Sequence, residues 1–218
     1  SGWLLMGLPG AIYLSGLSEA WIAIGLIIGA WLNWLLVAGR LRVHTEVQHN
    51  SLTLPDYFSN RFNDQRKILR IVSACVILVF FAIYCASGMV AGARLFESMF
   101  DLPYSTALWI SAIATISYVF IGGFLAVSWT DTIQAGLMIF ALLLTPIITL
   151  LSFSDLSQVT LALEAARPQA LNLVGDLSWV AIISLMAWGL GYFGQPHILV
   201  RFMAVDSVKS IPNARRIG

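Results

Sequence analysis

The sequence predicts an all-α polytopic membrane protein, and three observations lead to that prediction. Of its 218 residues, 59% are hydrophobic and only 11% are charged, about half of the charged share of an ordinary soluble domain. A soluble fold of this size could not bury so much apolar surface. The charges gather in short stretches and leave long apolar segments between them. Because a bilayer core needs about 20 apolar residues per helix, several segments are long enough to cross it.

About five full spans and one partial span follow one another along the chain. The partial span, Ser1–Leu14, covers only about 20 Å as a helix, which is too short to cross a bilayer. We therefore expect the chain to begin at membrane depth and to be an internal piece of a longer protein. The full spans are Ser18–Ala38, Ile68–Phe96, Tyr104–Ile121, Ala126–Phe153 and Ser178–Val200.

The distribution of Lys and Arg predicts the orientation of the spans. Ten of the twelve basic residues fall in the Arg40–Arg70 loop or after the last span, whereas the Glu97–Pro103 and Ser154–Leu177 loops hold only Arg167. Loops that are rich in Lys and Arg remain on the cytoplasmic side of a membrane. We therefore expect the Arg40–Arg70 loop inside and the Ser154–Leu177 loop outside.

The sequence offers no chemistry of an enzyme or of a nucleic-acid-binding protein. No catalytic triad, phosphate-binding loop or cluster of metal ligands is recognisable in it. Its basic residues lie in loops and not on a polar face with interleaved aromatics. Cys75 and Cys85 share one apolar segment without the spacing of a metal site.

The last span is interrupted near its end, in Trp188–His197. Glycine costs about 1 kcal/mol and proline about 3 kcal/mol in a helix interior. Backbone groups freed by a break are tolerated at membrane depth only around a cavity or against protein. Trp188 and Tyr192 would share a face if the helix persists between them. A binding site and a kinked structural helix with interfacial aromatics fit equally well. The interrupting residues are Gly189, Gly191, Gly194 and Pro196.

The opening span carries similar features. Ser1 and Gly2 precede Trp3, and Pro9-Gly10 is expected to interrupt the run. Here too a helix kink is an alternative to a ligand site. Four full spans separate the two interrupted ones, which is the interval expected for an inverted repeat of five helices. Interrupted spans in corresponding places of two repeats mark the binding site of many transporters.

Two polar residues inside spans are candidates for function. Tyr84 needs a hydrogen-bond partner in an apolar setting, so it serves either packing or ligand contact. Asp131 lies near the start of the Ala126–Phe153 span, where an ionisable residue suggests function but a helix cap is an equal alternative. The glycine pairs Gly25/Gly29 and Gly88/Gly92 have the spacing of close helix packing.

Several motifs resemble one family of membrane transporters. Tyr118–Ala126 is similar to the signature of the sodium:solute symporter family, and Thr53–Phe62 resembles that family's cytoplasmic loop. Further segments resemble its bacterial sodium/proline branch, and the likeness runs from end to end. These segments are Ser1–Gly10, Ile83–Ser87, Ser128–Asp131 and Trp188–His197.

The resemblance implies a leucine-transporter-type inverted-repeat fold. Residues 1–218 would form a single partial transmembrane transporter domain, namely the first repeat without the start of its first helix, plus the first helix of the second repeat. It also implies sodium-coupled uptake of L-proline by alternating access across a bacterial cytoplasmic (inner) membrane. The partners would be L-proline, Na⁺ and the lipid bilayer, with no organic cofactor and no nucleic acid.

The resemblance also assigns site residues. It places Asp131 in sodium coupling and leaves the remaining sodium ligands outside this chain. Pro196 and His197 would act in the substrate region or in gating. The substrate-binding residues that it implies are Ser1, Gly2, Trp3, Tyr84, Trp188 and Tyr192.

Two alternatives remain open at this point. The first is a sodium symporter of the same family for another small solute, such as pantothenate, a sugar or acetate. The second is a symporter-like sensor domain of a signalling protein.

Overall fold

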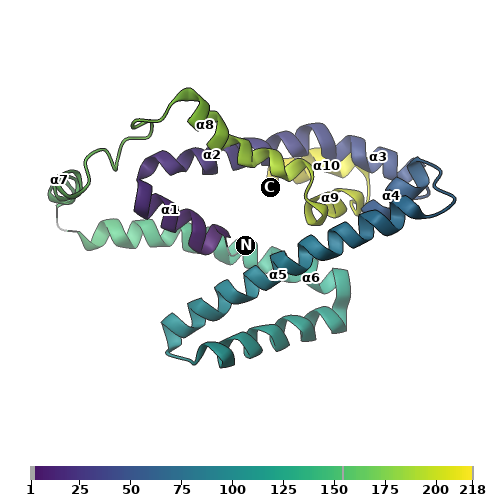
Figure 1. Ribbon diagram of the computed structural model, residues 1–218, viewed down its shortest axis with the longest axis horizontal. Helices are drawn as coiled ribbons and strands as arrows, with labels where there is room; N and C mark the ends of the chain where they lie inside the picture. The colour runs from purple at the N-terminus through teal and green to yellow at the C-terminus, as the bar shows by residue number, and fades with distance from the viewer. Residues whose placement is uncertain (1–2, 154, 218) are drawn as a thin grey trace. The chain divides into compact units, whose positions relative to one another are not determined.

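The computed structural model describes residues 3–153 and 155–217, and every regular element in these ranges is a helix (Figure 1). This confirms the prediction of an all-α chain. Contacts divide the chain into two compact units. The first comprises Ser1–Gly10 and Cys85–Leu171, and the second comprises Ala11–Tyr84 and Asn172–Gly218.

The second unit contains one long helical run, Leu17–Val47. It consists of a 3-10 turn at Leu17–Glu19, α2 (Ala20–Asn33), a π-helical turn at Trp34–Ala38 and α3 (Gly39–Val47). The helix thus continues well past the predicted span end at Ala38, because Gly39–Val47 contains no proline that would stop it.

Two further helices of this unit follow the Leu17–Val47 run. α4 (Leu54–Arg61) begins at Thr53, whose hydroxyl oxygen accepts a hydrogen bond from the Asp56 amide at 3.3 Å. α5 (Ile68–Phe100) then starts as predicted, and its residues up to Tyr84 belong to this unit. An ion pair of 2.9 Å between Arg70 and Asp56 joins α5 to α4.

The last predicted span is broken, as expected. α8 (Trp179–Met186) passes into a 3-10 helix at Ala187–Phe193, and α9 (Pro196–Met203) starts after the extended residue Gln195. A short 3-10 turn at Val208–Ser210 leads into α10 (Ile211–Ile217).

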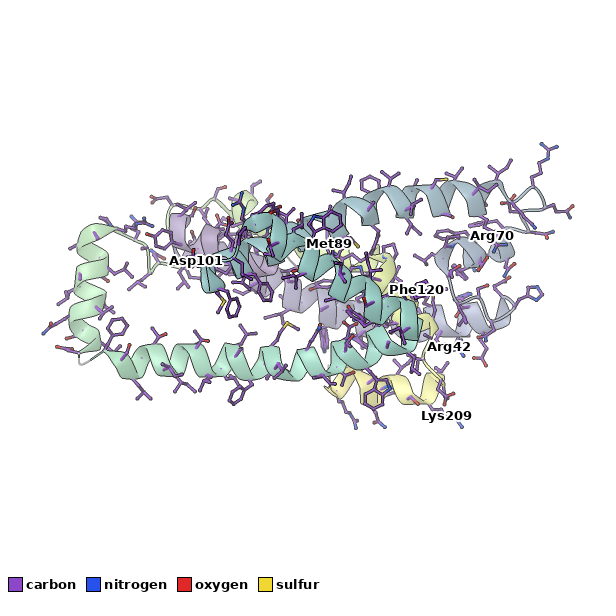
Figure 2. All side chains as sticks on the ribbon, turned by 90° about the horizontal axis from the view of Figure 1, so that it is seen from below. Arg42, Arg70, Met89, Asp101, Phe120 and Lys209 are labelled. Carbon is purple, nitrogen blue, oxygen red and sulfur yellow. The ribbon has the colours of Figure 1, made fainter. Side chains whose placement is uncertain are left out.

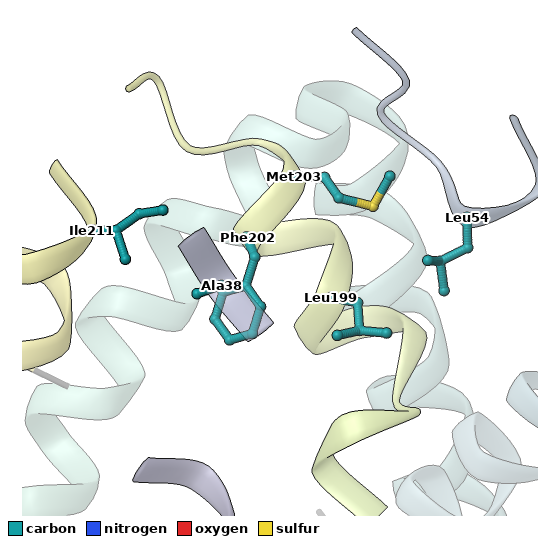
Figure 3. Close-up of a cluster of buried hydrophobic side chains, with 6 residues drawn as sticks. All are labelled: Ala38, Leu54, Leu199, Phe202, Met203 and Ile211. Carbon is teal, nitrogen blue, oxygen red and sulfur yellow. The ribbon is translucent and has the colours of Figure 1, made fainter. Parts of the chain in front are cut away.

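The core of the second unit lies around α9 (Figure 3). Phe202 packs edge-on against Trp34, with ring centroids 4.6 Å apart. Full burial of such a side chain contributes about 1.5–3 kcal/mol. This cluster anchors the segment after the break to α3, α4 and α10. Its buried members are Ala38, Leu54, Leu199, Phe202, Met203 and Ile211.

In the first unit, α6 (Tyr104–Ser152) contains two of the predicted spans. It bends at Gly123, whose φ of 52° and ψ of −140° are not helical, and its ribbon turns back there (Figure 1). Glycine adopts positive φ without steric cost. The bend falls within the short turn expected at Gly122–Leu125, just after the exposed Phe120 (Figure 2).

The predicted outer loop of the first unit holds a helix, α7 (Leu156–Ala166). The Asp155 carboxylate caps it by accepting hydrogen bonds from the Ser157 hydroxyl at 2.6 Å and from the Ser157 amide at 2.9 Å. These bonds lower the pKa of Asp155 because they stabilise its charged form.

The prediction that Pro9-Gly10 interrupts the opening span is wrong. α1 (Leu8–Ser15) passes through both residues and continues without a break from the π-helix that precedes it, so Pro9 lies inside a helical run. The irregular part is instead the preceding π-helix, Trp3–Gly7. The Trp3 side chain lies over Gly7, where a Cβ would come within 2.8 Å of it. Such π-helical turns are frequent at functional sites.

Candidate functional site

The break in the last span has a definite chemical cause at the Tyr192 carbonyl. In a continuing α-helix, that carbonyl would accept a hydrogen bond from the amide of residue 196. Residue 196 is proline and has no N–H. The 3-10 helix ends with a bond of 3.1 Å from the Gly194 amide to the Gly191 carbonyl, and Gln195 is extended, with φ −78° and ψ 112°. The chain therefore crosses residues 194–195 without helical pairing.

The expectation that Trp188 and Tyr192 share one face is wrong. Residues four apart differ by about 40° around an α-helix but by about 120° around a 3-10 helix. The segment is 3-10 between them, so the two side chains diverge. Tyr192 instead shares a face with Gly189, three residues earlier, while Trp188 remains 50% exposed.

Glycines allow the 3-10 segment to approach α2 at backbone contact. A Cβ atom at Gly29 would come closer than 3.0 Å to the Gly189 backbone, and one at Gly189 would overlap the Gly25 carbonyl. This confirms close packing for Gly25 and Gly29. At Gly88 and Gly92 such an atom meets nothing within 4 Å in the part of the chain that the structure describes.

Asn33 is a residue of this site that the sequence reasoning missed. It ends α2, is 1% exposed, and donates a hydrogen bond of 3.0 Å from its Nδ2 to the Tyr192 carbonyl. Its signal in the sequence was a lone amide side chain within an otherwise apolar run, where polar residues bond across helices.

Tyr84 lies beside the start of α9, on the other side of the break from Tyr192. Its ring stacks on the His197 ring, with centroids 5.7 Å apart and an angle of 23° between the planes. Phe81 meets the same imidazole edge-on at 5.5 Å. Tyr84 is 46% exposed, so this aromatic group is accessible from one side. The structure thus brings together Tyr84, Pro196 and His197, three of the predicted residues.

A pocket of about 530 Å³ adjoins the break. Phe193, Gly194 and Pro196 line it from the broken span, and mostly apolar side chains of α4 and α5 complete it. The Gln195 carbonyl already accepts the amides of Ile198 and Leu199 at 3.1 Å each. The first turn of α9 is therefore largely paired within the chain, and the pocket suits an apolar group better than an anion.

Comparisons with known proteins decide the family. The sequence model of the sodium:solute symporter family matches residues 1–218. The chain belongs to the sodium:solute symporter family. Among the residues that the structure describes, three helices are long and apolar enough to cross a membrane, in agreement with an integral membrane protein.

Curated members of this family match the chain over its whole length. It is 66% identical to the sodium/proline symporter of Escherichia coli, 54% to the high-affinity proline transporter of Bacillus subtilis and 49% to the sodium/proline symporter of Staphylococcus aureus. The match covers 100% of this chain and, in that order, 43%, 46% and 42% of those proteins, so the chain spans less than half of their length. No solved structure matches it.

The remaining predicted site residues lie elsewhere. Trp3 and Asp131 belong to the first unit, and Ser1 and Gly2 lie outside the described residues. Asp131 is more than two helical turns past the bend at Gly123, whereas capping and helix-dipole effects fade within the first turn. Helix capping therefore does not explain Asp131, and its part in sodium coupling stays a prediction.

Proposed function

We propose that the full-length protein takes up L-proline together with Na⁺ across a bacterial cytoplasmic membrane by alternating access. The observation that carries this proposal is 66% identity, over every residue of this chain, to a curated sodium/proline symporter. The activity belongs to the longer protein, because the chain spans 43% of that relative.

The broken span suits the apolar ring and the ammonium group of proline. Tyr84, Trp188 and Tyr192 offer aromatic faces, which can cover the pyrrolidine ring and attract its ammonium edge. Sodium bound elsewhere in the protein would stabilise the conformation that binds proline, and proline would raise the affinity for sodium by the same factor. Asp131 supports the sodium side of this coupling, and the other sodium ligands lie outside residues 1–218.

Uptake of labelled proline by the full-length protein tests the proposal. Cells without proline transport of their own would express it, and uptake would be measured in sodium and in potassium medium. We expect uptake only with sodium, and inhibition by unlabelled proline but not by pantothenate, glucose or acetate. No sodium-dependent uptake of labelled proline, together with sodium-dependent uptake of one of these three labelled solutes in the same cells, would transfer the proposal to another solute.

Alanine variants test the aromatic residues of the predicted substrate site. Loss of one good contact of about 1.4 kcal/mol weakens binding about tenfold. Trp188→Ala and Tyr192→Ala should therefore raise the proline concentration for half-maximal uptake, whereas Trp109→Ala, an exposed residue of α6, should not. Membrane levels of each variant serve as the control. Unchanged proline affinity in both site variants would place the substrate elsewhere.

A further inference from the structure

The Tyr192 carbonyl is an acceptor that the sequence itself leaves without a helical donor. Pro196 removes the N–H that an α-helix would supply. The 3-10 ladder ends with the bond from the Gly194 amide to the Gly191 carbonyl, and among the described residues no backbone bond joins the amide of residue 195 to the Tyr192 carbonyl. An unpaired carbonyl in a buried position carries its full desolvation penalty. Some donor from outside the broken span is therefore needed to hold this segment in place.

Asn33 is the donor that the fold supplies, from 159 positions away in the chain. Its Nδ2 lies 3.0 Å from the Tyr192 oxygen. Since a carbonyl can only accept, the NH₂ group must face Tyr192, and this fixes the orientation of the amide. The Oδ1 atom then points away from Tyr192, buried and without a hydrogen-bond partner among the described residues.

We propose that Asn33 is a positioning residue for substrate: it replaces the hydrogen bond that Pro196 removes, and so holds the 3-10 segment in the conformation that binds proline. This inference rests on the proposed function. Trp188 and Tyr192 both lie on that segment. Without the Asn33 amide, the Tyr192 carbonyl must turn toward another donor, and both aromatic side chains move with the backbone. The effect should therefore appear in proline affinity more than in maximal rate.

The test uses Asn33→Leu in the full-length protein, which keeps the approximate shape of the side chain and removes its donor. The apparent KM for proline should rise about tenfold, with a much smaller change in maximal rate at equal membrane levels. Thr45→Val is the matched control. Thr45 lies in the same helical run, is 0% exposed, and also donates one hydrogen bond to a carbonyl, that of Arg42 at 3.0 Å. Loss of this hydrogen bond in Thr45→Val should leave the KM for proline within about twofold of that of the unaltered protein.

A double-mutant cycle with Pro196→Ala separates positioning from general damage. Alanine at 196 offers an N–H that can serve the Tyr192 carbonyl, so Asn33→Leu should then raise the KM less than about threefold. If Asn33→Leu raises the KM by the same factor in the Pro196→Ala protein as in the protein that keeps Pro196, the inference is overturned. If the Asn33→Leu protein fails to insert into the membrane, Asn33→Ser is used in its place, because the serine hydroxyl is too short to reach the Tyr192 carbonyl.

The outcome also distinguishes this inference from the proposed function. No sodium-dependent proline uptake by the unaltered protein would refute the function itself. A raised KM in Tyr192→Ala, together with an unchanged KM in Asn33→Leu, would leave the function standing and remove Asn33 from it.

Discussion

Replacing Gly29 by alanine should destabilise the protein at the crossing of α2 and the 3-10 segment. Alanine favours a helix over glycine by about 1 kcal/mol, so a glycine in open space should gain stability from the change. At Gly29, however, the new methyl group would come closer than 3.0 Å to the backbone of Gly189. Backbone atoms cannot turn aside as a side-chain tip can. Overpacking of this kind costs about 1–3 kcal/mol, enough to cancel or outweigh the gain.

Gly39→Ala provides the control, because a Cβ atom there meets nothing within 4 Å in the described part of the chain. Gly39 continues the same helical run, so the two variants differ mainly in the steric contact. Thermal unfolding of the purified full-length protein in detergent would measure both. We expect Gly29→Ala to unfold several degrees below Gly39→Ala. If the two variants unfold at the same temperature, the backbone contact between α2 and the 3-10 helix is not present in the protein.

Three further predictions follow from the charged and polar residues. Asp131→Asn should raise the sodium concentration for half-maximal proline uptake several-fold at normal expression, and an unchanged sodium dependence would exclude Asp131 from coupling. Arg42→Met should cost about 2 kcal/mol of stability in detergent, because it loses its buried hydrogen bonds to the carbonyl end of α9 and to the loop after α3. The exposed Arg40→Met should cost almost nothing. Single cysteines at Asn63 and Gln169, in a background without native cysteines, should react with an impermeant reagent from opposite sides of the membrane, and labelling from one side would refute the topology.

The sequence predicted the helical architecture well, because its signals are local. Apolar runs of membrane length located the Leu17–Val47 run, α5 and α6, and the gap between the predicted spans Tyr104–Ile121 and Ala126–Phe153 located the bend in α6. The break before Pro196 was also predictable, since proline removes a defined hydrogen bond wherever it stands inside a helix. Pro9 and Pro146 show the limit of that rule, because both lie inside helical runs that continue through them.

The geometry of the site depended on information that the local sequence does not hold. Hydrophobic periodicity indicates a helix, but it did not show that residues 187–193 adopt three residues per turn and not 3.6. For that reason the sequence could not show that Trp188 and Tyr192 lie on different faces of the helix. The pairing of Asn33 with Tyr192 joins distant segments, and only the fold brings them together. The stacking of Tyr84 on His197 arises in the same way.

Proline accumulation in vesicles containing the purified full-length protein tests the central claim most directly. An inward sodium gradient would be the only energy source, and labelled proline would be followed inside the vesicles over time. The account predicts that proline inside the vesicles rises above its external concentration. A sodium ionophore, which dissipates the sodium gradient, should abolish this accumulation of proline. Equal proline entry with potassium in place of sodium, without accumulation, would contradict sodium-coupled symport.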